Sequence, residues 1–233
     1  MNRVMISGGG TGGHIFPALA IADAIKQRYP HASIRFVGAL GRMEMQRVPA
    51  AGYPIKGLWI SGIARKEWWR NFSFPFKVLS SVARSYVMLK SFKPDVVIGT
   101  GGFASGPLLF VANWLGIPTL LQEQNSYPGI TNKMLAGKAD AICVAYDNLE
   151  RWFPAEKMFI TGNPIRKQLL QPLPNSEHAR SQWGLRKDYF TVLVLGGSLG
   201  AKAINKALHK AIGPLGDAKI QILWQCGQLY YQK

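Results

Sequence analysis

The fold is decided by the stretch VMISGGGTGGH, residues 4–14, in which a short apolar run breaks into a glycine-rich turn. The apolar run predicts a buried β-strand, and the residues from Phe16 onward have the pattern of a helix. Glycines let the backbone turn tightly and approach a ligand closely. The start of the helix presents unpaired N–H groups and the positive end of its dipole. The turn therefore predicts a site for an anion, usually a phosphate.

A second stretch, VLVLGGSLGA at residues 192–201, repeats this device. Both turns contain Gly-Gly-(Thr/Ser)-x-Gly directly after a strand-like run. Neither turn ends in Gly-Lys-Ser/Thr, which excludes a P-loop. Two such turns in matching contexts predict two nucleotide-binding folds that face one cleft.

A dinucleotide site is an alternative for the first turn, because Gly8, Gly10 and Gly13 match the G-x-G-x-x-G fingerprint. That fingerprint also requires an acidic residue about 20 residues further on, which holds a ribose hydroxyl. Residues 38–42, at the end of the next predicted strand, contain no acidic residue. Arg42 is able to bind a 2′-phosphate, so an NADP-dependent oxidoreductase stays open as a less favoured reading.

Apolar runs alternate with helical patterns along the chain, which indicates an α/β fold with a parallel sheet. The predicted strands are Val4–Ser7, Ile34–Val37, Ile55–Ile60, Val96–Gly99, Thr119–Gln122, Ala141–Val144, Met158–Thr161, Thr191–Leu195 and Ile220–Trp224. The predicted helices are Phe16–Arg28, Met43–Ala50, Phe74–Phe92, Ser105–Leu115, Ile130–Leu135, Asn148–Trp152, Glu177–Trp183 and Ala201 to about Ile212. Pro164 interrupts the pattern, because the residue before a proline avoids helix. We expect one Rossmann-like domain over residues 1–163 and an incomplete second one over residues 164–233.

The formal charge of +16 on 233 residues predicts an anionic partner, such as a membrane surface or phosphorylated substrates, unless it reflects a generally basic solvated surface. Residues 63–93 interleave aromatic and basic side chains, which is typical of a surface that docks on a membrane. The other reading is that the aromatics pack in the core. No recognition motif supports a nucleic-acid partner. No signal peptide and no apolar stretch of roughly 18 residues is visible. The isolated Cys143 and Cys226 predict free thiols, and no metal-ligand spacing is present.

His14 is the candidate catalytic residue, because it closes the first glycine turn at the edge of the sheet where ligands bind. The positive end of the helix dipole disfavours a second positive charge, so we expect a neutral imidazole that accepts a proton. A general base contributes a factor of about 10² to 10⁴ in rate. The alternatives are a histidine that only makes local hydrogen bonds and, for Thr11, a hydroxyl that caps the helix.

Three further clusters follow predicted strands. Residues 99–107 form a third glycine cluster, which predicts either a ligand loop or a close turn between strand and helix. The amides and the acid of residues 122–125 are able to hold sugar hydroxyls or to satisfy loop backbone. Arg166 follows the predicted hinge, and its planar guanidinium suits either a diphosphate or a surface ion pair.

Taken together, these motifs resemble the MurG family, the bacterial cell-wall N-acetylglucosaminyltransferases. The resemblance rests on five clusters in the family's order, at residues 9–14, 99–107, 123–133, 162–166 and 196–201. It implies a GT-B fold with two Rossmann-like domains. It also implies transfer of N-acetylglucosamine from UDP-N-acetylglucosamine to lipid I, with inversion at the anomeric carbon, to give lipid II and UDP. No cofactor and no metal in the site are implied.

The resemblance also implies roles for particular residues. His14 matches the base that removes the proton from the 4-hydroxyl of the acceptor. The positions that match the family's donor-binding residues are Thr11, Gly12, Gly13, Asn125, Arg166 and Ser198. The basic aromatic segment matches a face that meets an anionic inner-leaflet membrane, so we expect a peripheral protein on the cytoplasmic face of the inner membrane. The residues expected to make this contact are Arg65, Lys66, Trp68, Trp69 and Arg70.

Two departures from the family pattern stand out. Gln122 replaces the histidine that many members carry before Glu-Gln-Asn. The family's second domain also continues beyond the length seen here, through residues that hold the ribose and the sugar. We therefore expect weak or absent transferase activity from these 233 residues alone. A remnant that docks on membranes without catalysis is the alternative.

Overall fold

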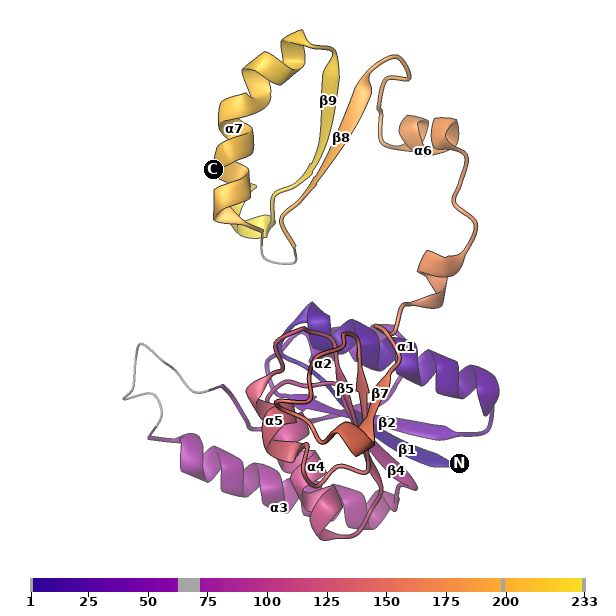
Figure 1. Cartoon of the computed structure of the whole chain (residues 1–233), viewed down its shortest axis with the longest axis vertical. Helices are drawn as coiled ribbons and strands as arrows, with labels where there is room; N and C mark the ends of the chain where they lie inside the picture. The colour runs from indigo at the N-terminus through magenta and orange to yellow at the C-terminus, as the bar shows by residue number, and fades with distance from the viewer. Residues whose placement is uncertain (1, 63–71, 198–199, 232–233) are drawn as a thin grey trace. The chain divides into compact units, whose positions relative to one another are not determined.

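The computed structural model describes residues 2–62, 72–197 and 200–231. The chain divides into two compact units, Met1–Leu170 and Gln171–Lys233, which are described separately below (Figure 1). The division falls after the short 3₁₀ helix η3 (Lys167–Leu170), a few residues beyond position 163.

Unit 1 is built on a seven-stranded sheet in which every neighbouring pair is parallel. Its strands are β1 (Arg3–Ser7), β2 (Ser33–Ala39), β3 (Ile55–Leu58), β4 (Val96–Gly99), β5 (Thr119–Glu123), β6 (Ala141–Val144) and β7 (Met158–Ile160). The order across the sheet is β3-β2-β1-β4-β5-β6-β7. Because β1 lies between β2 and β4, the direction in which the chain winds reverses at β1.

Two helical layers cover the two faces of this sheet (Figure 1). The helices are α1 (Gly12–Arg28), α2 (Glu44–Ala50), α3 (Phe74–Phe92), α4 (Ser105–Trp114) and α5 (Ile130–Leu135). Alternate side chains of each strand point to opposite faces. Val4 and Ile6 of β1 accordingly pack with α1 and α2, whereas Met5 packs with the core under α3 and α4. The result is a three-layer α/β/α domain.

The apolar patterns locate these elements well, with one failure. The predictions for α3, α5, β4 and β6 are confirmed at both ends. The predicted helix Asn148–Trp152 is wrong. Asn148 has a φ of 59°, a left-handed conformation that a helix interior does not contain. Leu149 then forms a single turn, in which its carbonyl accepts the amides of Trp152 and Phe153.

Unit 2 begins with α6 (Ser176–Gln182), whose first turn is capped by the side chain of Asn175 on the amide of Glu177 at 2.9 Å. The strands β8 (Phe190–Leu195) and β9 (Ile220–Gln225) then pair in parallel. They are joined by α7 (Lys202–Asp217), and the 3₁₀ helix η4 (Gln228–Tyr230) follows. This is a parallel strand–helix–strand unit, the building block of Rossmann-like folds.

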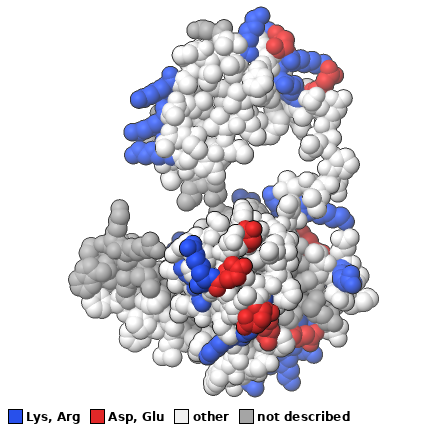
Figure 2. All heavy atoms as spheres, viewed as in Figure 1, with Lys and Arg blue, Asp and Glu red and all other residues white. Residues whose placement is uncertain are grey.

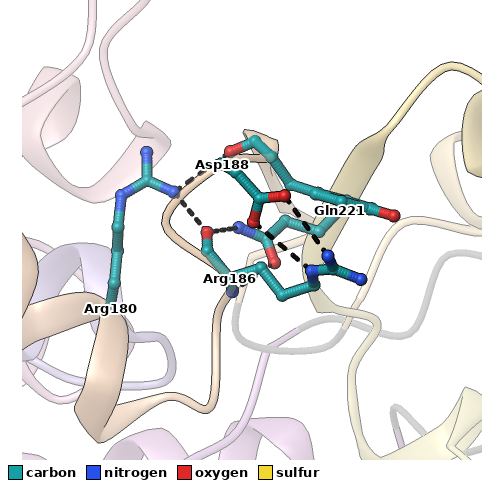
Figure 3. Close-up of polar contacts among 5 residues, drawn as sticks. Arg180, Arg186, Asp188 and Gln221 are labelled. Atoms are coloured by element: carbon teal, nitrogen blue, oxygen red, sulfur yellow. Dashed lines mark hydrogen bonds and ion pairs between the residues drawn. The ribbon is translucent and has the colours of Figure 1, made fainter.

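A polar network fastens α6 to the two strands of unit 2 (Figure 3). Arg180 donates to the hydroxyl of Thr191 at 2.8 Å and to the carbonyl of Arg186 at 3.1 Å. The side chain of Gln221 on β9 pairs with the backbone of Arg186, donating at 2.7 Å and accepting at 2.8 Å. Arg186 also forms an exposed ion pair with Asp188 at 3.2 Å. The loop between α6 and β8 is therefore held to both strands.

Basic side chains outnumber acidic ones. Lys and Arg outnumber Asp and Glu by 28 to 12 along the chain. Figure 2 shows them gathered along the edge of unit 2 over α7, the helix that carries the exposed Lys202, Lys206 and Lys210. Within the described ranges, none of the helices is both long enough and apolar enough to cross a membrane.

Candidate functional site

The candidate site lies at the carboxyl end of the sheet in unit 1, where the strand order reverses between β1 and β4. β1 pairs with β2 on one side and with β4 on the other. Ligands of open parallel sheets bind in the crevice at such a reversal. Residues 8–13 follow β1 and residues 100–104 follow β4, so the first and third glycine clusters of the sequence lie at this one point.

The two glycine turns are in direct contact. The amide of Gly9 donates to the carbonyl of Gly101 at 3.3 Å. Gly102 has a φ of +90°, and a Cβ atom there would lie 2.2 Å from the carbonyl oxygen of Gly9. The hydroxyl of Thr100 donates to the carbonyl of His14 at 2.8 Å. The third cluster is thus a close turn that supports the first one.

His14 lies in the first turn of α1 and is half-buried. Its Nδ1 atom is 3.1 Å from the carbonyl oxygen of Gly9 and 3.4 Å from the hydroxyl of Thr11. Because a carbonyl oxygen only accepts hydrogen bonds, the contact with Gly9 assigns the proton to Nδ1. Nε2, which then carries a lone pair, lies beside Gly101, where a Cβ atom would be 3.0 Å away. The ring is arranged to accept a proton at Nε2.

A hollow of about 320 Å³ opens at this imidazole. It is lined by Gly9, Gly10, Thr11, His14, Arg42, Gly62, Gly102 and Phe103. The side chain of Phe103, which is 40% exposed, lies over Gly10. The hollow therefore combines a proton acceptor, a cation and an aromatic face.

The N-terminus of α1 supplies hydrogen-bond donors to the same region. Thr11 is the N-cap residue, but its side chain makes no capping hydrogen bond to the helix, so the capping alternative for this hydroxyl is not supported. In the part of the chain that the structure describes, the amides of Gly12 and Gly13 have no hydrogen-bond partner. Unpaired amides and the positive end of the helix dipole favour an anion at this end of α1.

The acidic motif at the end of β5 is organised around Glu123, which is buried. One carboxylate oxygen accepts the backbone amide of Asn125 at 3.0 Å and its side-chain amide at 2.9 Å. The other accepts the amide of Gly129 at 3.0 Å and the side-chain amide of Asn132 at 2.9 Å. Glu123 therefore holds loop backbone, and Asn125 stays exposed at the edge of the sheet.

One path of hydrogen bonds connects four of the sequence motifs. Asn163 donates to the carbonyl of Gln124 at 3.4 Å, and Gln124 donates to the carbonyl of Thr100 at 2.9 Å. Thr100 in turn donates to His14. Motifs as far apart in the sequence as His14 and Asn163, which are separated by 149 positions, are thereby brought to one edge of the sheet.

Arg166 lies against α1. Its guanidinium is 4.4 Å from the centroid of the Phe16 ring, a cation–π contact. The same ring is close to Gly12, where a Cβ atom would be 3.1 Å from it. The cation therefore lies near the end of α1 whose dipole is positive, and both favour an anionic group.

Six of the expected residues fall outside the described ranges: Ser198, Arg65, Lys66, Trp68, Trp69 and Arg70. The second glycine turn belongs to unit 2. There the amide of Gly196 donates to the carbonyl and to the side-chain oxygen of Gln225, each at 3.0 Å.

Glu44 is a site residue that the sequence reasoning missed. It is fully buried at the start of α2, and its carboxylate accepts the amides of Gly10 and Ala39, both at 2.9 Å. The dinucleotide fingerprint predicts an acid at the end of β2, in residues 38–42, and Glu44 lies only two positions beyond this range. Glu44 therefore binds the first glycine turn through the amide of Gly10.

The remaining chemistry of the described residues is limited. Within residues 2–62, 72–197 and 200–231, no group of three or more His, Cys, Asp or Glu is placed to hold a metal ion. Cys143 and Cys226 are free thiols and half-buried. Burial raises the pKa of the Cys143 thiol, which makes it less reactive.

Comparison with known proteins places the chain in a family. Residues 4–144 match the model of the glycosyltransferase family 28 N-terminal domain. A relative from Christiangramia forsetii is 57% identical over 99% of this chain, and one from Flavobacterium psychrophilum is 55% identical over 99%. Both are named UDP-N-acetylglucosamine–N-acetylmuramyl-(pentapeptide) pyrophosphoryl-undecaprenol N-acetylglucosamine transferase. The chain covers 63% of the length of each of these relatives.

A solved structure supports the same assignment. The crystal structure of MurG from Acinetobacter baumannii is 32% identical, with a TM-score of 0.71, over 100% of this chain and 62% of that one. The likeness confirms an α/β fold of the GT-B type. On the evidence of its motifs, its fold and these relatives, the chain belongs to glycosyltransferase family 28 and, within it, to the MurG family.

Proposed function

We propose that this protein transfers N-acetylglucosamine from UDP-N-acetylglucosamine to lipid I, the undecaprenyl-diphosphate-linked muramoyl pentapeptide, giving lipid II and UDP. The names of the relatives support this choice of substrates over nicotinamide chemistry. The observation that carries the proposal is the position of His14: its Nδ1 contacts the Gly9 carbonyl, which leaves Nε2 to accept a proton, and its ring lines a hollow.

In the proposed reaction, Nε2 of His14 accepts the proton of the acceptor's 4-hydroxyl group. The oxygen forms a bond to the anomeric carbon of N-acetylglucosamine while the bond from that carbon to the UDP oxygen breaks. UDP leaves with the electron pair, and attack from the opposite side inverts the anomeric centre. A positioned base of this kind contributes about 10² to 10⁴ in rate.

We propose that Thr11, Gly12, Gly13, Asn125, Arg166 and Ser198 bind the donor. The free amides of Gly12 and Gly13 and the guanidinium of Arg166 support this for an anionic donor, because each favours negative charge. Asn125 suits hydroxyl recognition, since its side-chain oxygen remains after its N–H groups bind Glu123. For Ser198 the support is the family motif alone.

A membrane surface is the second proposed partner. α3 and α4 pack together and expose an apolar surface, defined here as Phe76, Leu79, Val87, Phe110 and Trp114, whose residues are 50–70% exposed. Two lysines border this surface. Lys90 is 5.8 Å from the Tyr86 ring, and Lys138 is 5.9 Å from the Phe110 ring.

Apolar groups bordered by cations suit the interface of an anionic leaflet, where each basic residue is worth about 1 kcal/mol. In the sequence, α3 follows the segment that contains Arg65, Lys66, Trp68, Trp69 and Arg70. We therefore propose peripheral binding at the cytoplasmic face of the inner membrane. The same surface also supports the alternative function, a protein that docks on the membrane without catalysis.

Transfer of labelled N-acetylglucosamine to a soluble lipid I analogue tests the proposed reaction. It is measured for residues 1–233 and for a completed chain, in which these residues are joined to the part of the C. forsetii relative that they do not match. We expect transfer and UDP release by the completed chain. A completed chain that is folded and binds UDP-N-acetylglucosamine but transfers nothing would favour the docking alternative.

Flotation with vesicles that contain anionic phosphatidylglycerol tests the membrane proposal. Leu79→Glu places a charge in the apolar surface, and we expect it to weaken partitioning by about tenfold or more, from the apolar area lost. The control is Leu173→Glu. It makes the same substitution at a leucine that is 89% exposed and lies in unit 2, outside the apolar surface. Equal binding of the two variants would exclude docking through α3 and α4.

A further inference from the structure

We propose that Glu44 is a positioning residue for His14, and that it acts through the peptide group between Gly9 and Gly10. The inference deepens the proposed function, since it assumes that His14 is the base. It rests on three features of the described residues: the burial of Glu44, the space made for it, and the two ends of that one peptide group.

Glu44 is a carboxylate that the fold keeps buried without a cation. It is 0% exposed, and none of the ion pairs among the described residues includes it. Burying such a group is costly unless hydrogen bonds compensate. Its compensation comes from two backbone amides: Oε1 accepts that of Ala39, and Oε2 accepts that of Gly10. It also lies in the first turn of α2, where the helix dipole favours negative charge.

Two glycines make room for this carboxylate. A Cβ atom at Gly9 would lie 2.1 Å from Oε1 of Glu44, and one at Gly38 would lie 2.5 Å from its Cγ. Neither side chain could be accommodated without moving Glu44. The glycine at position 9 therefore serves the contact with Glu44, in addition to any approach of a ligand.

The peptide group between Gly9 and Gly10 connects Glu44 to the imidazole. Its N–H donates to Oε2 of Glu44 at 2.9 Å, and its carbonyl oxygen is 3.1 Å from Nδ1 of His14. In a planar trans peptide these two groups point in opposite directions, so the two hydrogen bonds are joined in series. Bonds in series polarise one another, which makes the Gly9 carbonyl a stronger acceptor.

Glu44 thereby fixes the tautomer of His14. A stronger acceptor at Gly9 keeps the proton on Nδ1 and leaves the lone pair on Nε2. In serine proteases a carboxylate orients the catalytic histidine by direct contact, and loss of that contact costs the correct tautomer. Here one peptide group stands between the two side chains. The second glycine turn has Ala201 at the position of His14, and there a neutral amide, Gln225, binds the turn.

Nitrogen NMR of the histidine ring tests this inference on residues 1–233 without any substrate. Spectra of ¹⁵N-histidine-labelled protein are recorded at about pH 8.5, well above the ordinary histidine pKa of about 6.5, where a ring is neutral. His14→Gln identifies the His14 signals. In the parent chain we expect a protonated Nδ1 and an unprotonated Nε2.

Glu44→Gln keeps the shape of the side chain but replaces one accepting oxygen with an NH₂ group, which cannot accept. We expect the Nδ1–H form to fall from the major to the minor tautomer of His14. The matched control is Glu123→Gln, which alters the other buried carboxylate of the site but touches neither Gly9 nor Gly10. We expect it to leave the His14 signals unchanged.

The inference is overturned if the parent chain carries the proton on Nε2, a result that needs no variant. It is also overturned if Glu44→Gln keeps the parent tautomer, or if both glutamine variants change it alike. In the completed chain, Glu44→Gln should lower kcat by about tenfold and leave the KM for the donor unchanged, because it weakens the base rather than binding. If the parent completed chain shows no transfer, the proposed function fails while the NMR result still decides the role of Glu44.

Discussion

The two glycine turns share one sequence pattern, but only the first carries an imidazole. Aligned from Gly9 and Gly196, the position of His14 corresponds to Ala201. Both turns join a parallel strand to a helix, β1 to α1 and β8 to α7. The pattern therefore encodes the turn, and the proposed catalytic chemistry would depend on one residue at its end.

The surroundings of the two turns differ in a related way. The first turn is backed by the carboxylate of Glu44 and by the turn after β4, where Gly102 lies against the Gly9 carbonyl. The second turn closes on the end of β9, where a Cβ atom at Gly200 would lie 2.0 Å from the carbonyl oxygen of Cys226. Asn205 donates to that same carbonyl at 2.9 Å. Close approach of two backbones explains the glycines at positions 102 and 200, and it is not by itself evidence of catalysis.

The largest effect is expected from making the first turn like the second. In the completed chain, His14→Ala should lower kcat by about 10² to 10⁴, because the proton acceptor is removed while the turn is kept. The reciprocal variant Ala201→His should not restore any of this loss in the His14→Ala background. Turnover of His14→Ala equal to the parent rate would remove the base assignment and, with it, the contrast between the turns.

An intermediate effect is expected from adding a methyl group where two backbones meet. Gly102→Ala and Gly200→Ala each combine a positive φ with a close carbonyl, and we expect each to destabilise its own unit by about 3 kcal/mol. Gly116→Ala and Gly184→Ala also have positive φ but no atom within 4 Å, and should cost only about 1 kcal/mol.

Amide hydrogen exchange in β1 and β8 measures these losses in each unit separately. The comparison is sharpened if Gly102→Ala speeds exchange only in β1 and Gly200→Ala only in β8. If Gly102→Ala and Gly200→Ala destabilise their units no more than the two control variants do, the turns are able to accommodate a side chain at these positions.

The smallest effect concerns one aspartate in each unit. The backbone amides of Asn2 and Arg3 lower the pKa of Asp95 in unit 1, and the hydrogen bond and charge of Arg186 lower the pKa of Asp188 in unit 2. A folded pKa below the unfolded one stabilises each unit above the ordinary aspartate pKa of about 3.9. That stabilisation is lost as pH falls through the folded pKa.

Salt separates the two causes. Screening at about 0.5 M salt weakens the exposed Arg186–Asp188 pair but not backbone hydrogen bonds. Carboxyl ¹³C titrations at low and high salt should show the pKa of Asp188 returning toward its ordinary value while that of Asp95 stays low. An equal response of both residues would contradict this assignment of causes.

The sequence predicts an element best where local signals, such as an apolar pattern and capping residues, also determine that element in the fold. α3 combines a helical apolar pattern with Pro75 in its first turn and Lys93 in a left-handed C-cap before Pro94, and both of its ends are predicted correctly. α1 begins at Gly12 rather than at Phe16. Glycine has low helix propensity, but the first turn of this helix is bound by the turn after β4, where Thr100 donates to the His14 carbonyl, and the local sequence does not contain this contact.

Prediction of the candidate site is limited in the same way, because local sequence does not encode contacts between distant elements. The motifs around His14, Asn125 and Arg166 are visible because each follows a strand, and parallel strands end at one edge. The contacts that join them, such as Gln124 to Thr100, depend on strand order, which no local pattern encodes. Glu44 escaped detection for this reason: its partners, Gly10 and Ala39, lie on other elements.

The central place of β1 in the sheet has a consequence for synthesis of the chain on the ribosome. β1 is able to pair with β2 as soon as Ala39 has emerged, but its other edge waits for Val96–Gly99. Until then an apolar strand keeps one row of N–H and C=O groups open, a template for aggregation. Nascent chains that stall before β4 should therefore be clients of ribosome-associated chaperones, and release from them should coincide with assembly of the His14 turn.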